Sequence, residues 1–161
     1  MSELELPRIT LKTEVEPPQG MNIYQAIPEM VEFRRLETAP PKARTLGLGR
    51  MVITLDGENG ELVALQSYVK TGRWKTGEAE TPPMPDAEGA LIIAYPGGTE
   101  DFAYLPAEPR FIWHDESSSL RISLGEGTAL VFKVADCLLV GVDREGGLTD
   151  IWMLGLDLNL E

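Results

Sequence analysis

Cysteine and histidine each occur once in this chain of 161 residues, as Cys137 and His114. A single cysteine excludes an internal disulfide framework, and with one histidine it leaves too few ligands for a zinc centre. Calcium needs a larger set of oxygen ligands than either acidic turn, at 56–61 or 143–145, provides. We therefore predict that the protein has no metal site and no cofactor.

Long apolar runs and positive charge are also scarce. No stretch reaches the roughly 18 apolar residues of a membrane-spanning helix. The 14 Lys and Arg stand against 26 Asp and Glu, a net charge of −12. Nucleic acids and anionic membranes are bound through basic residues, so neither is expected as a partner. The acidic N-terminus lacks the apolar segment of a signal peptide, which together with the single cysteine favours a cytoplasmic protein.

Proline is absent from the last 52 residues, since all twelve prolines lie at or before Pro109. Proline cannot donate to a β-ladder and is confined to edges, strand starts and turns. The C-terminal third is therefore the best candidate for the centre of a sheet. We predict a mainly β protein, with an antiparallel meander forming a sandwich or a partly open barrel.

The N-terminal part is predicted to contain one strand and one short helix. Alternation in RITLKTEV at 8–15 indicates a strand. Residues 21–36 approximate a helical stripe, and Pro28 suits the first turn of a shorter helix at 28–36. Residues 1–45 would then form an arm packed on the same domain. Residues 46–161 would form the antiparallel β domain.

Within that β domain, an acidic hairpin unit recurs. It reads ITLDGENGELVAL at 53–65, IWHDESSSLRISL at 112–124 and VGVDREGGLTDIW at 140–152. In each copy an Asp ends one strand and a Leu opens the next. Asp at a strand end accepts hydrogen bonds from backbone amides two residues on, and any β-meander reuses this chemistry. The recurrence therefore has two explanations, which are the shared turn chemistry of a β-meander and a true internal duplication.

Three stretches of the C-terminal half carry a family resemblance: WHDE at 113–116, LRI at 120–122 and VDREGGL at 142–148. Through these strand ends and turns, residues 111–154 resemble a family of small β-rich bacterial domains of unknown function. The resemblance implies a β-rich fold and assigns no activity.

No complete catalytic set is evident, so we predict that the protein is not an enzyme. His114 lies beside Asp115 and Glu116, but neighbouring strand residues point to opposite faces and make a poor triad. Cys137 follows an acidic residue, which disfavours a reactive thiolate and predicts a buried, inert thiol.

Arg73, Trp74 and Lys75 form the one basic and aromatic spot, at the start of a predicted exposed loop at 71–89. Trp and Arg dominate binding hot spots, so these three are candidate partner-binding residues. We predict a domain that acts by protein–protein interaction, either as a homodimer or by covering a basic partner as an inhibitor or immunity-type protein does. The alternative is a small-ligand-binding or hydrolytic β-barrel protein with carboxylates in an interior pocket.

Overall fold

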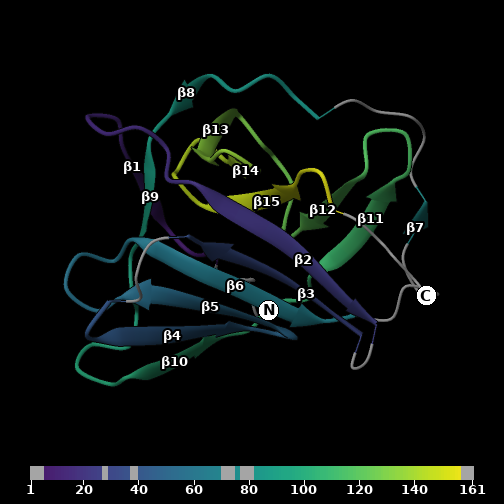
Figure 1. The fold of residues 1–161 in the computed structure, drawn as a ribbon. Helices are drawn as coiled ribbons and strands as arrows, with labels where there is room; N and C mark the ends of the chain where they lie inside the picture. The colour runs from purple at the N-terminus through teal and green to yellow at the C-terminus, as the bar shows by residue number, and fades with distance from the viewer. Residues whose placement is uncertain (1–5, 27–28, 37–39, 70–74, 77–81, 157–161) are drawn as a thin grey trace.

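The computed structural model describes residues 6–26, 29–36, 40–69, 75–76 and 82–156. These residues form two large β-sheets packed face to face, with a small two-stranded sheet at one side (Figure 1). None of the sheets closes into a barrel, so the arrangement is a β-sandwich.

The first large sheet has six strands in the order β10-β4-β5-β6-β3-β2. Its strands β4, β5 and β6 form an antiparallel meander, β2 and β3 form a hairpin beside it, and β10 pairs with β4 in parallel. The bounds are β2 (Gly20–Ala26), β3 (Glu29–Arg35), β4 (Ala43–Leu48), β5 (Met51–Asp56), β6 (Leu62–Tyr68) and β10 (Phe102–Leu105).

The second large sheet has seven strands in the order β7-β11-β12-β15-β14-β13-β8. Its centre is antiparallel and comes from the proline-free part of the chain, which the sequence predicts to be central. The two short outer strands pair in parallel, β7 with β11 and β8 with β13. The bounds are β7 (Lys75–Thr76), β8 (Ala87–Glu88), β11 (Arg110–His114), β12 (Ser119–Ser123), β13 (Leu130–Ala135), β14 (Leu138–Val142) and β15 (Leu148–Met153).

The small sheet pairs β1 (Ile9–Lys12) with β9 (Ala90–Ile93). Single bridges extend it toward both large sheets, from Arg8 to Gly147 and from Ile92 to Glu61. It therefore closes one side of the sandwich.

The predicted N-terminal helix is wrong, because the described residues contain no helix and this segment is the β2–β3 hairpin. In β3, Val31 and Phe33 are buried while Glu32 and Arg34 are not, which is the period of a strand. The apolar spacing only approximated a helix, and the pairing of β3 with β6 decided the structure. Pro28 lies between the two strands, outside the described residues.

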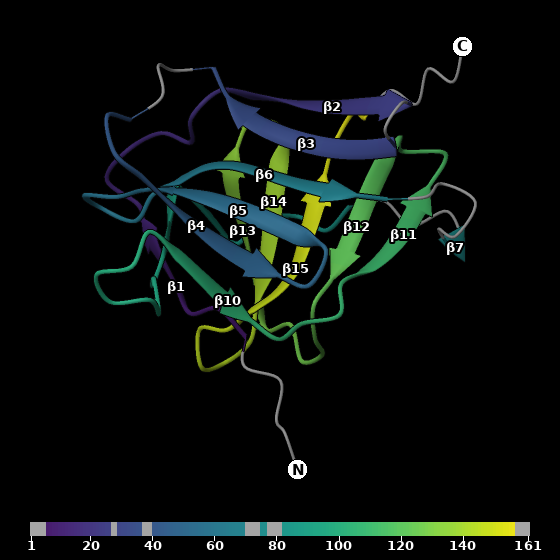
Figure 2. The same ribbon diagram turned by 90° about the horizontal axis from the view of Figure 1, so that it is seen from below.

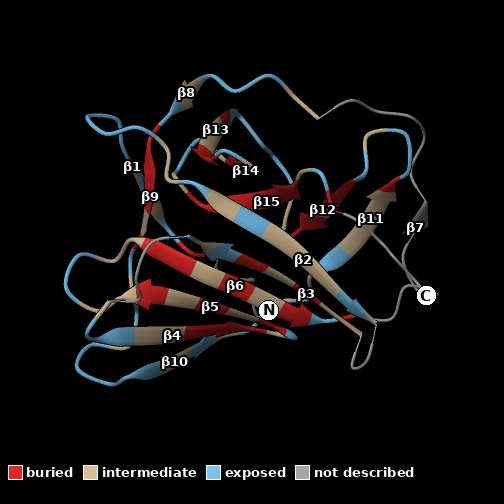
Figure 3. Ribbon diagram, in the orientation of Figure 1, coloured by how far each residue is buried: buried red, intermediate tan, exposed pale blue. Residues whose placement is uncertain are grey.

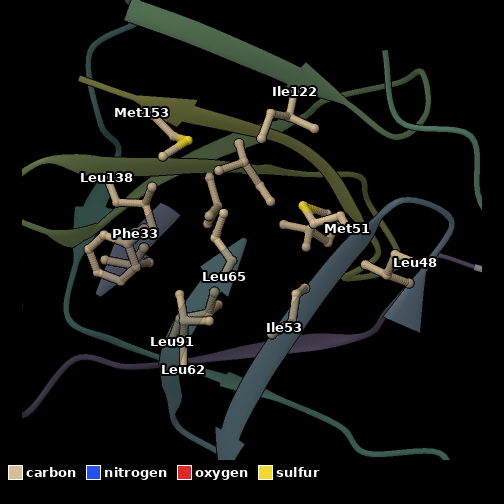
Figure 4. Close-up of a cluster of buried hydrophobic side chains, with 14 of the residues drawn as sticks. Phe33, Leu48, Met51, Ile53, Leu62, Leu65, Leu91, Ile122, Leu138 and Met153 are labelled. Atoms are coloured by element: carbon tan, nitrogen blue, oxygen red, sulfur yellow. The ribbon is translucent and has the colours of Figure 1, made fainter. Parts of the chain in front are cut away.

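The space between the sheets is filled by one continuous apolar cluster (Figure 4). Phe33, Ile53 and Leu65 from the first sheet meet Ile122 and Leu138 from the second. Burial of this kind contributes about 25 cal/mol for each Å² of apolar surface removed from water. Figure 3 shows buried residues along most of β9, β12, β14 and β15 and along parts of β4, β5 and β6, and exposed residues on β10.

One corner of the sandwich is held by polar contacts from β2. The Asn22 Nδ2 group donates to the carbonyl oxygens of Cys137 (2.9 Å) and Leu154 (2.8 Å). The Gly20 amide donates to the Asp136 carboxylate at 2.9 Å. These bonds attach the edge of the first sheet to the β13–β14 turn and to the residue that follows β15 in the second.

Candidate functional site

A buried polar cluster lies on the outer face of the seven-stranded sheet. Asp150 on β15 is completely buried and accepts a hydrogen bond from Arg121 Nε on the neighbouring strand β12, at 2.9 Å. The Arg121 side chain is 31% exposed. A buried carboxylate needs such a partner, since an unpaired charge away from water is strongly unfavourable.

The second carboxylate oxygen of Asp150 is also engaged. Thr128 donates its hydroxyl to Oδ2, and the Thr128 and Thr149 hydroxyl oxygens lie 2.7 Å apart. Gly141 pairs with Asp150 across β14 and β15. A Cβ at Gly141 would come within 2.8 Å of Thr128 Cγ2, so glycine is what lets Thr128 approach the carboxylate.

Arg121 is held in place by two different contacts. Its Nε is bound to Asp150, and its guanidinium carbon lies 5.4 Å from the centre of the Trp152 ring, within the range of a cation–π interaction. Among the described residues, no hydrogen bond is made by its Nη1 or Nη2 groups. These two groups are the fork that binds carboxylates and phosphates in a bidentate manner.

A cavity of about 250 Å³ opens beside Arg121, between the sheet and the segment that leads into β8. Figure 1 shows this segment passing over β13, β14 and β15. Asp86 fastens it, because its backbone and carboxylate exchange hydrogen bonds with the backbone of Val131. The cavity is lined by Pro82, Pro83, His114, Ser119, Arg121, Thr128, Val131 and Trp152.

Hydroxyl and imidazole groups form the end of the cavity beside β11. His114 and Ser119 are both buried and face each other across β11 and β12. The Ser119 hydroxyl lies 2.6 Å from that of Ser117. The cavity therefore combines one guanidinium, hydrogen-bonding groups and an apolar wall that includes Trp152 and Val131, a composition typical of small-molecule sites.

The acidic residues considered from sequence fall into different places. His114 reaches the cavity, whereas Asp115 and Glu116 are exposed in the following turn. Asp115 accepts a hydrogen bond from the indole of Trp113 at 3.3 Å. Sequence adjacency thus did not place His114 and these carboxylates in one constellation.

Two of the three acidic hairpin turns are stabilised by the carboxylates of their own aspartates, as the sequence predicts, whereas the Asp115 carboxylate accepts the Trp113 indole instead. Asp56 accepts the Glu58 amide at 2.8 Å. Asp143 accepts the amides of Glu145 and Gly147 at 2.9 and 2.8 Å. The described residues hold no group of three or more His, Cys, Asp and Glu side chains arranged to bind a metal.

Cys137 is half-buried at the β13–β14 turn. Burial, and then the neighbouring charge of Asp136, raise the pKa of its thiol to about 12. The thiol is therefore protonated near neutral pH, which favours the predicted lack of reactivity, although the residue is half-buried and not fully buried as the sequence predicts.

The candidate partner-binding spot lies mainly outside the described residues. Arg73 and Trp74 belong to the segment 70–74, and only the backbone of Lys75 is described, at the start of β7. Strand β7 pairs with β11 at one edge of the seven-stranded sheet.

Sequence reasoning missed Arg121 and Asp150 as a pair. One signal was present, because Asp150 interrupts the strand LTDIWM with a charge and Arg121 alternates with the apolar Leu120 and Ile122. Pairing the two positions requires knowing that β12 and β15, separated by two other strands in the chain, are neighbours.

Fold and cavity together define a β-sandwich with a small, Arg-centred cavity on an outer sheet face. A comparison with protein-family models finds no matching family, and a comparison with curated proteins finds no match. Within the described part of the chain, no helix has the length and apolar character needed to cross a bilayer.

Proposed function

We propose that this protein is a non-enzymatic binding protein that holds a small carboxylate-bearing molecule in the cavity beside Arg121. The observation that carries the proposal is the Arg121 guanidinium, fixed through Nε by a fully buried carboxylate while its Nη groups are left for a ligand. Preorganisation of this kind lowers the entropy lost when a ligand binds.

Size and charge favour a small monoanion. A cavity of about 250 Å³ falls below the usual range of drug-sized sites, roughly 300–1,000 Å³. The net charge of −12 disfavours the approach of multiply charged anions such as phosphate esters. The indole of Trp152 and the prolines at 82 and 83 suit an apolar body attached to the carboxylate.

Binding is favoured over catalysis because the buried carboxylate is already committed. Asp150 Oδ1 accepts from Arg121 and Oδ2 accepts from Thr128, so neither oxygen is placed to take a proton from a ligand. Asp150 acts here as a positioning residue for the guanidinium.

The test is a titration of the full chain with acetate, benzoate and inorganic phosphate, followed by two-dimensional NMR. Benzoate should shift resonances of Trp152 and Thr128 in a saturable manner. Arg121→Lys keeps the charge and loses the planar fork, and should weaken binding by about tenfold or more. Arg110→Lys is the matched control, because Arg110 lies on β11 outside this cavity and should leave affinity unchanged.

Three results would contradict the proposal. The first is that neither acetate nor benzoate shifts the cavity resonances. The second is that the Arg110→Lys variant loses as much affinity as Arg121→Lys. The third is that phosphate binds more tightly than both carboxylates. The last result would keep Arg121 as an anion site and overturn the choice of ligand.

Contact with a protein partner, self-association included, is a second candidate function. The negative charge favours a basic partner. A separate observation favours self-association: Phe102 and Tyr104 are large aromatic side chains exposed on the edge strand β10.

A further inference from the structure

Strand β10 ends the six-stranded sheet and pairs on one side only among the described residues. Figure 1 and Figure 2 show it beside β4 at the margin of the sandwich. The Thr45 amide donates to the Asp101 carbonyl at 2.9 Å. In a parallel ladder with this register, the backbone N–H and C=O groups of Ala103 and Leu105 also point toward β4. The backbone N–H and C=O groups of Phe102 and Tyr104 therefore point toward the free edge.

The side chains of these two residues lie on the outer face of the sheet. Phe102 is 57% exposed and Tyr104 is 58% exposed. Both rings lean toward Gly47 on β4, because a Cβ there would meet Tyr104 Cδ2 at 3.1 Å and Phe102 Cζ at 3.2 Å. The edge therefore presents two aromatic rings and two sets of outward backbone groups together.

The four residues of β10 carry no charge in a strongly acidic chain, although the exposed Asp101 directly precedes them. Residues 102–107 read FAYLPA, while the whole chain has a net charge of −12. Natural proteins commonly protect exposed edges with charged side chains, bulges or a covering segment. The Pro106 that follows β10 limits its length, but Phe102 to Leu105 carry no protective charge.

We propose that β10 pairs antiparallel with β10 of a second copy of this chain, which joins two six-stranded sheets into one. A twofold axis at Ala103 places Phe102 opposite Tyr104 of the second copy, where their outward backbone groups meet. The same register places Asp101 opposite Leu105, so no like charges face each other. Two symmetric cross-strand aromatic pairs result, a self-complementary contact of the kind that closes a dimer.

This inference names a partner for the second candidate function and is independent of the carboxylate site. The experiment is native mass spectrometry and sedimentation equilibrium of the full chain without added ligand. We expect a dimer whose population rises with protein concentration. Tyr104→Lys should raise its dissociation constant on the order of tenfold or more, through loss of two aromatic pairs and the new charge.

Two further variants separate strand pairing from general aromatic contact. Tyr104→Pro removes an amide that faces the free edge and bonds to no neighbour in the sheet, so it should abolish the dimer while the monomer still folds. Tyr68→Lys is the matched control, because Tyr68 is a 59% exposed aromatic on the same outer face but on the internal strand β6. It should leave the dimer intact.

A monomer at every concentration would overturn the inference, as would a dimer that survives both Tyr104 variants. Equal loss in Tyr68→Lys would also overturn it, since that result assigns the contact to the sheet face and not to the edge. Circular dichroism of each variant confirms that the sandwich is folded before its mass is interpreted.

Discussion

The two large sheets bury their strands differently. On β5 of the six-stranded sheet, burial alternates, with Met51, Ile53 and Leu55 buried and the intervening residues half-buried. On β14 and β15 of the seven-stranded sheet, every residue is buried. The first sheet thus has one buried face, as antiparallel sheets commonly do. The second sheet is buried on both faces near its centre.

Double coverage explains why the polar cluster lies where it does. Ile151 and Met153 contribute to the main core, whereas Trp152 packs with Val131 and Leu139 in a second apolar cluster on the outer face. A charged residue on that outer face is removed from water and must find partners there. Asp150 therefore accepts hydrogen bonds from Arg121 and Thr128, and the cavity lies beside these residues.

The largest expected effects on stability come from replacing two adjacent residues on one strand of each sheet by alanine. Ile151→Ala and Trp152→Ala should each lower the free energy of unfolding by about 3 kcal/mol, because both side chains are buried, on opposite faces. On β5, Ile53→Ala should cost a similar amount and Thr54→Ala only about 0.5 kcal/mol. Urea denaturation of the four variants measures this. A mild effect of Trp152→Ala would show that the second face is not a packed layer.

Substitution of one aspartate on each sheet extends this comparison. Asp150→Ala should destabilise the protein by about 3 kcal/mol, because the Arg121 guanidinium and the Thr128 hydroxyl lose the buried carboxylate that they share. Asp56→Ala removes one turn hydrogen bond on the six-stranded sheet and should cost about 1 kcal/mol. Thermal unfolding of both variants provides the measurement. Equal losses would contradict the role given to the buried pair.

Two glycines on the outer faces offer a smaller contrast. Gly141→Ala would place a methyl group 2.8 Å from Thr128 Cγ2 and 3.3 Å from the Asp150 Cβ, and should cost about 2 kcal/mol. Gly47→Ala would meet the exposed rings of Phe102 and Tyr104, which can shift, and would lie at ordinary contact distance from the Ala103 carbonyl oxygen, so its effect should stay within about 0.5 kcal/mol. Chemical denaturation distinguishes the two outcomes, and equal losses would show that the two outer faces are equally open at these positions.

The smallest expected effect concerns the corner where the two sheets meet. Asn22→Ala removes two hydrogen bonds from β2 to the other sheet and should lower the free energy of unfolding by about 1 kcal/mol. Gln25→Ala, an exposed position on the same strand, should have almost no effect. Hydrogen exchange at the Leu154 amide, which bonds to the Cys137 carbonyl, should quicken in the first variant only.

Most strands were predictable because their apolar residues alternate or because turn residues bound them. Asp56 and Asn59 mark the β5–β6 hairpin, and the predicted turn chemistry is confirmed by their bonds to Glu58 and Glu61. The segment 21–36 was not, since its apolar spacing fits a helix and a strand almost equally well. Pairing of Phe33 with Leu65 on β6 decided between them.

The candidate site was much less predictable than the fold. Arg121 and Asp150 lie 29 positions apart in the chain and meet through the pairing of β12 with β15. His114 was singled out for its acidic neighbours, yet its side chain lines a cavity with Ser119 and Trp152 instead. Cross-strand partners of this kind depend on strand order, which local periodicity does not encode.

By itself, the sequence determined the β-rich class, the acidic charge, the acidic hairpin turns and the proline-free centre of a sheet. These properties follow from local chemistry, namely turn-forming residues, alternation and the missing amide of proline. The tertiary structure alone decided that β2 and β3 are strands, that one sheet is covered on both faces, and that Arg121 meets Asp150. Each of those outcomes depends on contacts between residues far apart in the chain, whose free energy no short stretch of sequence contains.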